Sequence, residues 1–122
     1  MQRMDDQRYI RQTLLPEIGP GGQELLARAC VLIAGAGGLG SVTALYLAAA
    51  GIGHIKIIDS DIVEFSNLNR QIIHSEAFLE QPKTISAAIR IKALNSRVRV
   101  TPVRTRITHH NIDGLLTDVD IH

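Results

Sequence analysis

An apolar run that passes directly into a glycine-rich turn constrains the fold of this chain more than any other feature. The stretch VLIAGAGGLGS, residues 31–41, has the composition of a buried strand followed by the first turn of a helix. Gly35, Gly37 and Gly40 match the spacing GxGxxG, and Asp59 ends the next apolar run. Strand, turn and helix in this order bind nucleotide phosphates in doubly wound α/β folds. We therefore predict a Rossmann-like parallel sheet with helices on both faces.

The glycines of this turn have different predicted tasks. The first permits a sharp turn, the second lets backbone amides approach phosphate, and the third lets the helix pack closely on the strand. Amide groups at the start of the helix carry partial positive charge, which favours an anion. Asp59 is placed to accept hydrogen bonds from ribose hydroxyls. The alternative is a structural turn that binds no ligand.

The rest of the sequence alternates helix and strand patterns. Residues 1–29 predict an N-terminal helical segment, with Asp5 or Asp6 capping its first helix and the second helix at 22–29. Residues 30–122 predict the first part of the Rossmann-like domain. A buried strand that starts at 118–121 would normally continue, so we expect a truncated chain that lacks the C-terminal half. The expected strands are 30–35, 54–59 and 97–103, and the expected helices are 38–51, 82–95 and a short one within 109–116.

Composition excludes several classes of function. The net charge is +1, and the basic residues between Arg90 and Arg106 alternate with apolar ones, so we expect a solvated face and no nucleic-acid partner. The single cysteine, Cys30, excludes an internal disulfide and lies in an apolar run, where we expect a buried and unreactive thiol. No apolar stretch is long enough to cross a bilayer and the start is not a signal peptide, so we expect a cytoplasmic protein.

The loop after Asp59 bears on the choice between ATP and a nicotinamide cofactor. Asp61 adds a second carboxylate, and two carboxylates beside phosphates would repel the ligand unless one meets ribose and the other helps hold Mg²⁺. Arg70, Lys83 and Arg11 are cations able to bind phosphate oxygens. This set fits phosphoryl or nucleotidyl transfer and has no use in hydride transfer. Further hydrogen-bonding side chains of the loop are Ser66, Asn67, Asn69, Arg70 and Gln71.

Plainer alternatives exist for each of these residues. Arg70, Lys83 and Arg11 could be ordinary surface charges, and the two asparagines could serve only to shape turns. No metal-ligating set is predicted, because the histidines lack Cys, Asp or Glu partners at ligand spacing, and we expect surface or capping positions for them. For the whole chain the alternatives are an NAD(P)-dependent oxidoreductase and a non-catalytic nucleotide-binding or dimerisation fragment. The histidines concerned are His74, His109 and His110.

Three stretches resemble the ThiF/MoeB/HesA family, the bacterial relatives of the ubiquitin-activating enzymes. Together they cover nearly all of the chain. The resemblance implies a Rossmann-like ATP-binding domain that works as a homodimer or pseudo-dimer, and we expect a homodimer here. It also implies that ATP·Mg²⁺ adenylates the C-terminal glycine carboxylate of a ubiquitin-like sulfur carrier, in molybdopterin or thiamine biosynthesis, and that pyrophosphate is released. The stretches are RYIRQTLLPEIGPGGQELLARACVLIAGAGGLGS, IKIIDSDIVEFSNLNRQ and QPKTISAAIRIKALN.

The same resemblance implies roles for individual residues. Gly38 would lie against the nucleotide, and Asp59 would bind its ribose. The segment 66–70 would line the phosphate and adenosine region, with Asn67 and Arg70 the strongest candidates. Lys83 would neutralise charge on the phosphates, and Arg11 would reach across the dimer into the partner's site.

Other parts of the family pattern come after the matched stretches. They are an aspartate that binds Mg²⁺, the groove for the carrier protein, a cysteine used by some members and, in many members, a zinc site of two CxxC pairs. Cys30 is therefore not expected to be catalytic, and zinc is expected only beyond residue 122. We expect the 122-residue chain to be inactive or only weakly nucleotide-binding.

Overall fold

A parallel sheet forms the centre of the fold. The structure, a computed structural model, describes residues 7–122. Within them β1 (Cys30–Ala34), β2 (His54–Asp59) and β3 (Arg99–Arg104) pair in the order β1-β2-β3. All pairs are parallel, with Cys30 opposite His54 and His54 opposite Arg99. The predicted α/β class with a parallel sheet is confirmed.

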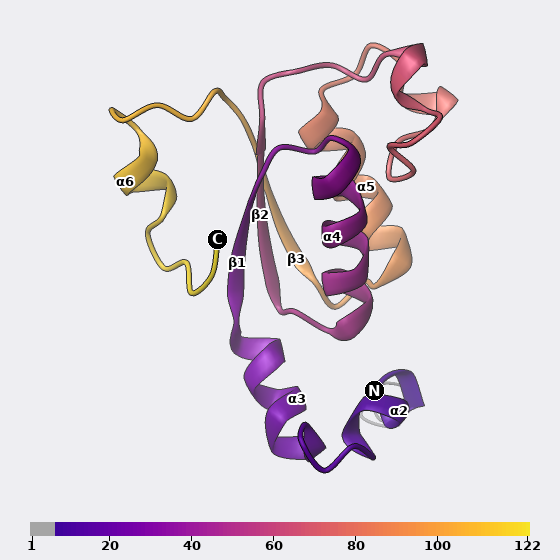
Figure 1. Cartoon of the computed structure of the whole chain (residues 1–122), viewed down its shortest axis with the longest axis vertical. Helices are drawn as coiled ribbons and strands as arrows, with labels where there is room; N and C mark the ends of the chain where they lie inside the picture. Colours follow the sequence, from indigo (N-terminus) through magenta and orange to yellow (C-terminus); the bar gives the residue numbers. More distant parts are fainter. Residues whose placement is uncertain (1–6) are drawn as a thin grey trace.

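Helices lie on both sides of this sheet. The long helices α4 (Gly38–Ala50) and α5 (Lys83–Leu94) cover one face, and the short α6 (Ile112–Leu115) lies on the other side (Figure 1). The segment after α6 is tied to that second face because Nζ of Lys56 on β2 donates to the carbonyl oxygen of Thr117 at 2.7 Å. The two faces are therefore covered very unequally.

The apolar core lies between the sheet and the two long helices. Ile55 and Ile57 alternate along β2 and are fully buried, as a strand period of two requires. They meet Ala44 on α4 and Ile91 on α5 within one cluster. Small alanines on the helices let α4 and α5 approach the sheet closely, so a core almost without aromatic residues is still well packed.

The chain returns to the far edge of β1 near its end. Ile121 forms a parallel bridge with Val31, and the Leu32 N–H donates to the Ile121 carbonyl oxygen at 2.9 Å. Because β2 and β3 lie on the other side of β1, the order of strands reverses at β1. Ligands of open α/β sheets bind at the carboxyl end of such a switch point, which is where the glycine turn lies. The predicted strand at 118–121 is present only as this bridge.

Element boundaries differ slightly from the predicted ones. Helix α3 (Gly19–Arg28) begins earlier than predicted because Gly19, at φ +60°, and Pro20 form its start. Strand β3 begins at Arg99 because the Val98 N–H closes a turn on Asn95 at 3.2 Å. Helix α2 spans Ile10–Thr13, and the predicted caps Asp5 and Asp6 lie outside the described residues. The division at residues 29 and 30 stays a prediction.

Candidate nucleotide site

Two glycines of the turn are required by the fold itself. Gly35 has φ +100°, a left-handed conformation that other residues rarely adopt, and its N–H donates to Ile58 at 2.7 Å. A Cβ on Gly40 would collide with the carbonyl oxygen of Gly35, so only glycine lets α4 start this close to β1. The sharp turn and the close packing predicted for these two positions are confirmed.

The other two glycines leave space beside the turn. A Cβ on Gly38 would meet no atom within 4 Å, and one on Gly37 would lie 3.8 Å from Nε2 of Gln71. The N–H groups of Gly37, Gly38 and Leu39 donate to no acceptor in the described part of the chain. Free amides at the start of a helix of this length offer donors and a favourable dipole to an anion.

Asp59 ties the end of β2 to the glycine turn. Its Oδ2 accepts from the Ala36 N–H at 2.7 Å, and its Oδ1 accepts from the Asp61 N–H at 2.8 Å. A carboxylate has about four acceptor positions, so oxygens bound in this way retain capacity for ribose hydroxyls. The structure thus gives Asp59 a structural task that was not predicted, beside the proposed ribose contact.

A cavity of about 340 Å³ opens in the loop between β2 and α5, which begins just after Asp59. Three of the predicted site residues, Asp61, Asn67 and Lys83, line it, together with Ser60, Ile62 and Glu64. The Lys83 N–H donates to the Asp61 carbonyl oxygen at 3.0 Å, which holds the start of α5 against the loop.

Lys83 is the cation of this cavity, which the carboxylates of Asp61 and Glu64 also line. It is the first residue of α5 and only 7% exposed. Within residues 7–122 its Nζ has neither a hydrogen-bond acceptor nor a carboxylate partner. Burial of a charge without a partner is costly. An anionic group of a ligand beside Nζ would supply the partner that Lys83 lacks, while Asp61 and Glu64 line the same cavity with carboxylates.

The loop side chains next to the cavity are held by local hydrogen bonds. Asn67, in the short helix η1 (Phe65–Asn67), is 8% exposed, and its Oδ1 accepts from the Glu64 N–H at 2.8 Å. Through this bond Asn67 shapes the turn, which is the alternative role considered above for the two asparagines. Ser66, Asn69 and Arg70 are exposed, and Arg70 donates to the Ser66 carbonyl at 3.1 Å and to Oδ1 of Asn69 at 3.0 Å.

Arg11 does not join these residues within one chain. It is exposed on α2, below the amino ends of the strands, whereas the glycine turn lies at their carboxyl ends (Figure 1). A role for Arg11 in this site would require another copy of the chain.

The prediction for His74 is wrong, since the residue is neither at the surface nor a cap. It is 5% exposed, with Nε2 2.9 Å from the Ala36 carbonyl oxygen and Nδ1 2.7 Å from Oγ of Ser86. Burial lowers its pKa. The apolar residues just before it, in RQIIH, were the available signal of burial. His109 and His110 are exposed as expected.

Two further buried polar groups near the site lack a partner among the described residues. They are Oε1 of Gln71, which is 4% exposed, and Oγ1 of Thr84 in the first turn of α5. Buried polar atoms nearly always have a hydrogen-bond partner, so such exceptions require an explanation. Gln71 lies against Gly37, and Thr84 follows Lys83 in the sequence. Thr84 was not singled out from sequence.

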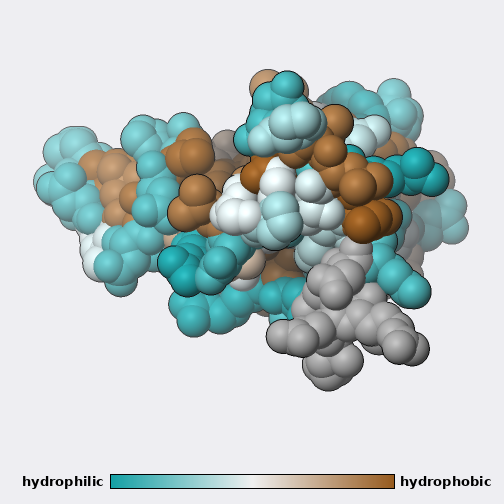
Figure 2. Space-filling view, turned by 90° about the horizontal axis from the view of Figure 1, so that it is seen from below, coloured by the Kyte–Doolittle hydropathy of each residue, from teal (hydrophilic) through white to brown (hydrophobic). Residues whose placement is uncertain are grey.

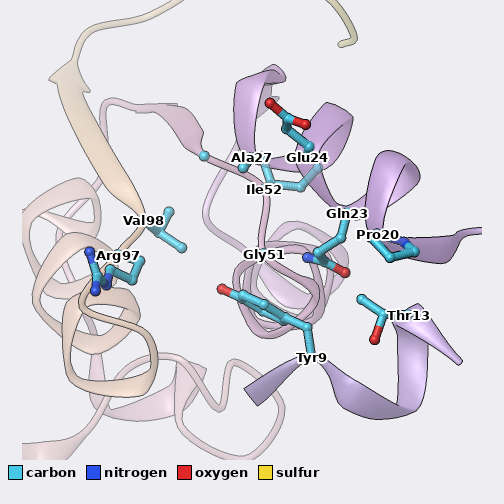
Figure 3. Close-up of a pocket in the computed structure, with 11 residues that line it drawn as sticks. Tyr9, Thr13, Pro20, Gln23, Glu24, Ala27, Gly51, Ile52, Arg97 and Val98 are labelled. Carbon is cyan, nitrogen blue, oxygen red and sulfur yellow. The ribbon is translucent and has the colours of Figure 1, made fainter. Parts of the chain in front are cut away.

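A larger cavity, of about 440 Å³, lies at the amino ends of the strands, at the opposite end of the sheet from the glycine turn. Tyr9 and Gln23 point toward Gly51, and Arg97 and Val98 line the other side (Figure 3). Seen from this end of the molecule, hydrophobic and hydrophilic residues are mixed on the surface (Figure 2). None of the predicted site residues lines this cavity, so it is separate from the glycine turn.

Two predictions from composition are also tested. Cys30 is 6% exposed, and burial raises the pKa of its thiol, as expected for an unreactive core cysteine. The basic residues from Arg90 to Arg106 are exposed.

Among residues 7–122, no helix is long and apolar enough to cross a membrane, and no three His, Cys, Asp or Glu side chains are grouped to hold a metal.

With this geometry established, comparison with known proteins identifies the family. Residues 9–121 match the ThiF family. The chain belongs to the ThiF family. It is 46% identical over 117 residues to the adenylyltransferase and sulfurtransferase MOCS3 of Danio rerio, covering 96% of this chain and 26% of that protein. It is 44% identical over 114 residues to the sulfur carrier protein adenylyltransferase of Thermus thermophilus, covering 93% of this chain and 42% of that protein.

A solved structure of a ThiF relative has the same fold. The crystal structure of E. coli tRNA N6-threonylcarbamoyladenosine dehydratase, TcdA, in complex with ATP matches with a TM-score of 0.85 and 35% identity. The match covers 92% of this chain and 45% of that chain. The chain therefore spans between a quarter and a half of the length of these three relatives.

Proposed function

We propose that this protein is an ATP-dependent adenylyltransferase and that its substrate is the C-terminal glycine carboxylate of a ubiquitin-like sulfur carrier. The observation that carries the proposal is the nearly buried Lys83, which has no anionic partner among residues 7–122 and lines a cavity in the loop that Asp59 joins to the glycine turn. Curated relatives named adenylyltransferases, at 44% and 46% identity, support the reaction class.

ATP·Mg²⁺, when bound, would supply an α-phosphorus to the attacking carboxylate, and the bond from this phosphorus to the bridging oxygen would break so that pyrophosphate leaves. The protein's part is positioning and charge neutralisation. The free amides of Gly37 and Gly38 hold phosphate oxygens, Lys83 offsets their negative charge, and Asp59 accepts from the ribose. No protein base is needed, because the attacking carboxylate is already ionised at neutral pH.

Two of the remaining predicted site residues, Asn67 and Asp61, line the cavity. In the proposal Asp61 helps to hold Mg²⁺, and the segment 66–70, with Asn67 and Arg70 foremost, lines the phosphate and adenosine region, as the family resemblance implies. Asp61 lines the cavity with a carboxylate, which is the donor type that Mg²⁺ prefers. Neither molybdopterin nor thiamine synthesis is favoured by a feature of the described residues, and a cytoplasmic location remains part of the proposal.

The proposal includes a homodimer. Large apolar side chains are exposed along the outer faces of α4 and α5, and the two helices pack side by side. Exposed apolar side chains gathered on two neighbouring helices support an interaction site here. A second copy on this surface would give Arg11 a site to act in, since it is distant from the cavity of its own chain. The side chains, called here the α4–α5 surface, are Leu39, Val42, Tyr46, Ile85 and Ile89.

Replacement of Lys83 by alanine tests the reaction. In a protein of the relatives' full length that contains this chain, we expect Lys83→Ala to lower the rate of carrier-dependent exchange of pyrophosphate into ATP by about 100-fold, as expected for removal of a cation at developing charge. Arg90→Ala, an exposed cation on the same helix, is the matched control and should exchange normally. A carrier without its terminal glycine should support no exchange. Exchange unchanged by Lys83→Ala would contradict the proposal.

The oxidoreductase alternative is tested by ligand stabilisation. A ligand that binds only the folded state raises the unfolding temperature. We expect ATP·Mg²⁺ to raise it and NADH to leave it unchanged. Stabilisation by NADH alone would overturn the adenylyltransferase assignment.

A further inference from the structure

A buried histidine joins the glycine turn to helix α5. The ring of His74 contacts the carbonyl oxygen of Ala36 through Nε2, at 2.9 Å, and Oγ of Ser86 through Nδ1, at 2.7 Å. Ala36 lies between the first two glycines of the turn and is fully buried. Ser86 lies on the first turns of α5, the helix that begins with Lys83. One side chain therefore connects the two elements that border the nucleotide site.

The two partners determine where the ring carries its hydrogen. A carbonyl oxygen only accepts, so Nε2 of His74 is the donor to Ala36. Burial lowers the pKa of His74, which the bond to Ala36 and the charge of Asp59 partly oppose and the charge of Lys83 reinforces. The ring is thus neutral at neutral pH. Nδ1 then accepts from the hydroxyl of Ser86.

The bond to Ala36 also sets the direction of an amide in the turn. A peptide group is planar and trans, so the Ala36 carbonyl and the Gly37 N–H point in opposite directions. The Gly37 N–H has no acceptor among the described residues. The N–H of Ala36 is held by Asp59. Asp59 therefore fixes the peptide group before Ala36, and His74 fixes the one after it. The N–H of Gly37, which belongs to the second of these groups, is left free.

We propose that His74 is a positioning residue, which aims the Gly37 N–H at the nucleotide phosphates and keeps Lys83 aligned with the turn. The inference rests on the proposed function, because it needs phosphates at the turn. It assigns His74 no proton transfer and no contact with substrate. Adenosine alone has no phosphates to reach the turn, so its binding does not depend on His74.

Two conservative substitutions separate the two hydrogen bonds. The amide nitrogen of glutamine reaches the place of Nε2, so His74→Gln retains a donor for Ala36. The shorter asparagine reaches only the place of Nδ1, so His74→Asn loses the Ala36 bond and keeps a group near Ser86. Binding of ATP·Mg²⁺ and of adenosine to each variant is measured by calorimetry. His110→Asn, at an exposed histidine, is the matched control.

The expected result is a selective loss of phosphate binding. His74→Asn should weaken ATP binding about tenfold, the effect of one hydrogen bond, while adenosine binding changes little. His74→Gln should bind ATP like the unaltered protein. Equal ATP affinity of both variants, or parallel loss of ATP and adenosine, would overturn the inference. Failure of the unaltered protein to bind ATP would instead contradict the proposed function.

Discussion

At the scale of single residues, the glycine turn is held from several sides. Gly35 supplies a left-handed backbone, Asp59 binds the Ala36 N–H, and His74 binds the Ala36 carbonyl. Such a turn has little freedom left before a ligand arrives. Preorganised amides stabilise an anion without the cost of ordering them at the moment of binding.

Gly40 and Gly38 allow a prediction that separates folding from binding. Gly40→Ala should lower the free energy of unfolding by about 2 kcal/mol, because the added Cβ collides with backbone. Gly38→Ala should leave it unchanged or slightly higher, since the methyl group has open space. Urea unfolding measures both changes. If the two variants are equally stable, the packing argument for Gly40 is wrong.

At Gly38, the effect of substitution on ATP binding should differ from its effect on stability. In Gly38→Ala the methyl group occupies space where the nucleotide is proposed to lie, so ATP binding should weaken although the fold is intact.

The sequence was sufficient for the sharp turn at Gly35 and the close packing at Gly40, because their spacing follows local rules. The role of Lys83 rests on the family resemblance and stays a prediction. It was insufficient for His74, whose acceptor on Ala36 lies far away in the chain and comes near only through packing of the loop on α5. The free amides and the second task of Asp59 also depend on tertiary contacts. Residue-level roles that rest on the resemblance stay predictions.

At the scale of elements, the C-terminal end of α4 is capped by side chains from three other segments. Nδ2 of Asn95 donates to the Ala48 carbonyl at 2.8 Å. Nε2 of Gln12 and of Gln23 donate to the Ala50 carbonyl at 2.9 and 3.0 Å. The last carbonyls of a helix have no partner within it, so these bonds replace water. They also attach the N-terminal helices to the sheet domain.

Asn95 is the buried member of this cap and gives a second stability prediction. It is fully buried, and Asn95→Ala would leave the Ala48 carbonyl and the hydroxyl of Tyr9 without this donor. We expect a loss of about 2 kcal/mol in the free energy of unfolding. The exposed neighbour Ser96→Ala is the control and should have almost no effect. Equal stability of the two variants would show that the cap contributes nothing.

Helices and strands of the sheet domain were predictable because apolar periodicity and glycine or proline signals agree there. The first residues of α3 and of β3 were less predictable, because a turn there competes with the helix or strand for the same residues. The strand expected at 118–121 is a bridge to Val31, since pairing depends on the neighbouring strand as well as on local sequence.

At the scale of the whole molecule, the α4–α5 surface is the feature that predicts assembly. Tyr46 is 73% exposed and Ile89 is 48% exposed, on neighbouring helices. We expect the protein to sediment as a dimer, and Tyr46→Glu or Ile89→Glu to shift it to a monomer, because a charge buried in an interface is costly.

The control for this experiment lies away from the two helices. Arg106→Glu, in the exposed segment that leads to α6, should remain dimeric. A dimer that persists in both glutamate variants would exclude the α4–α5 surface as the interface. Loss of the dimer should also lower exchange activity if Arg11 acts in the partner's site.

The double attachment of Ala36 has a consequence for sequence variation. Asp59, His74 and Ser86 act through a shared backbone position, so the effect of replacing one depends on which residues occupy the other two. Positions 59, 74 and 86 should therefore behave as one epistatic unit. Substitutions there would be tolerated as compensating combinations more readily than one at a time.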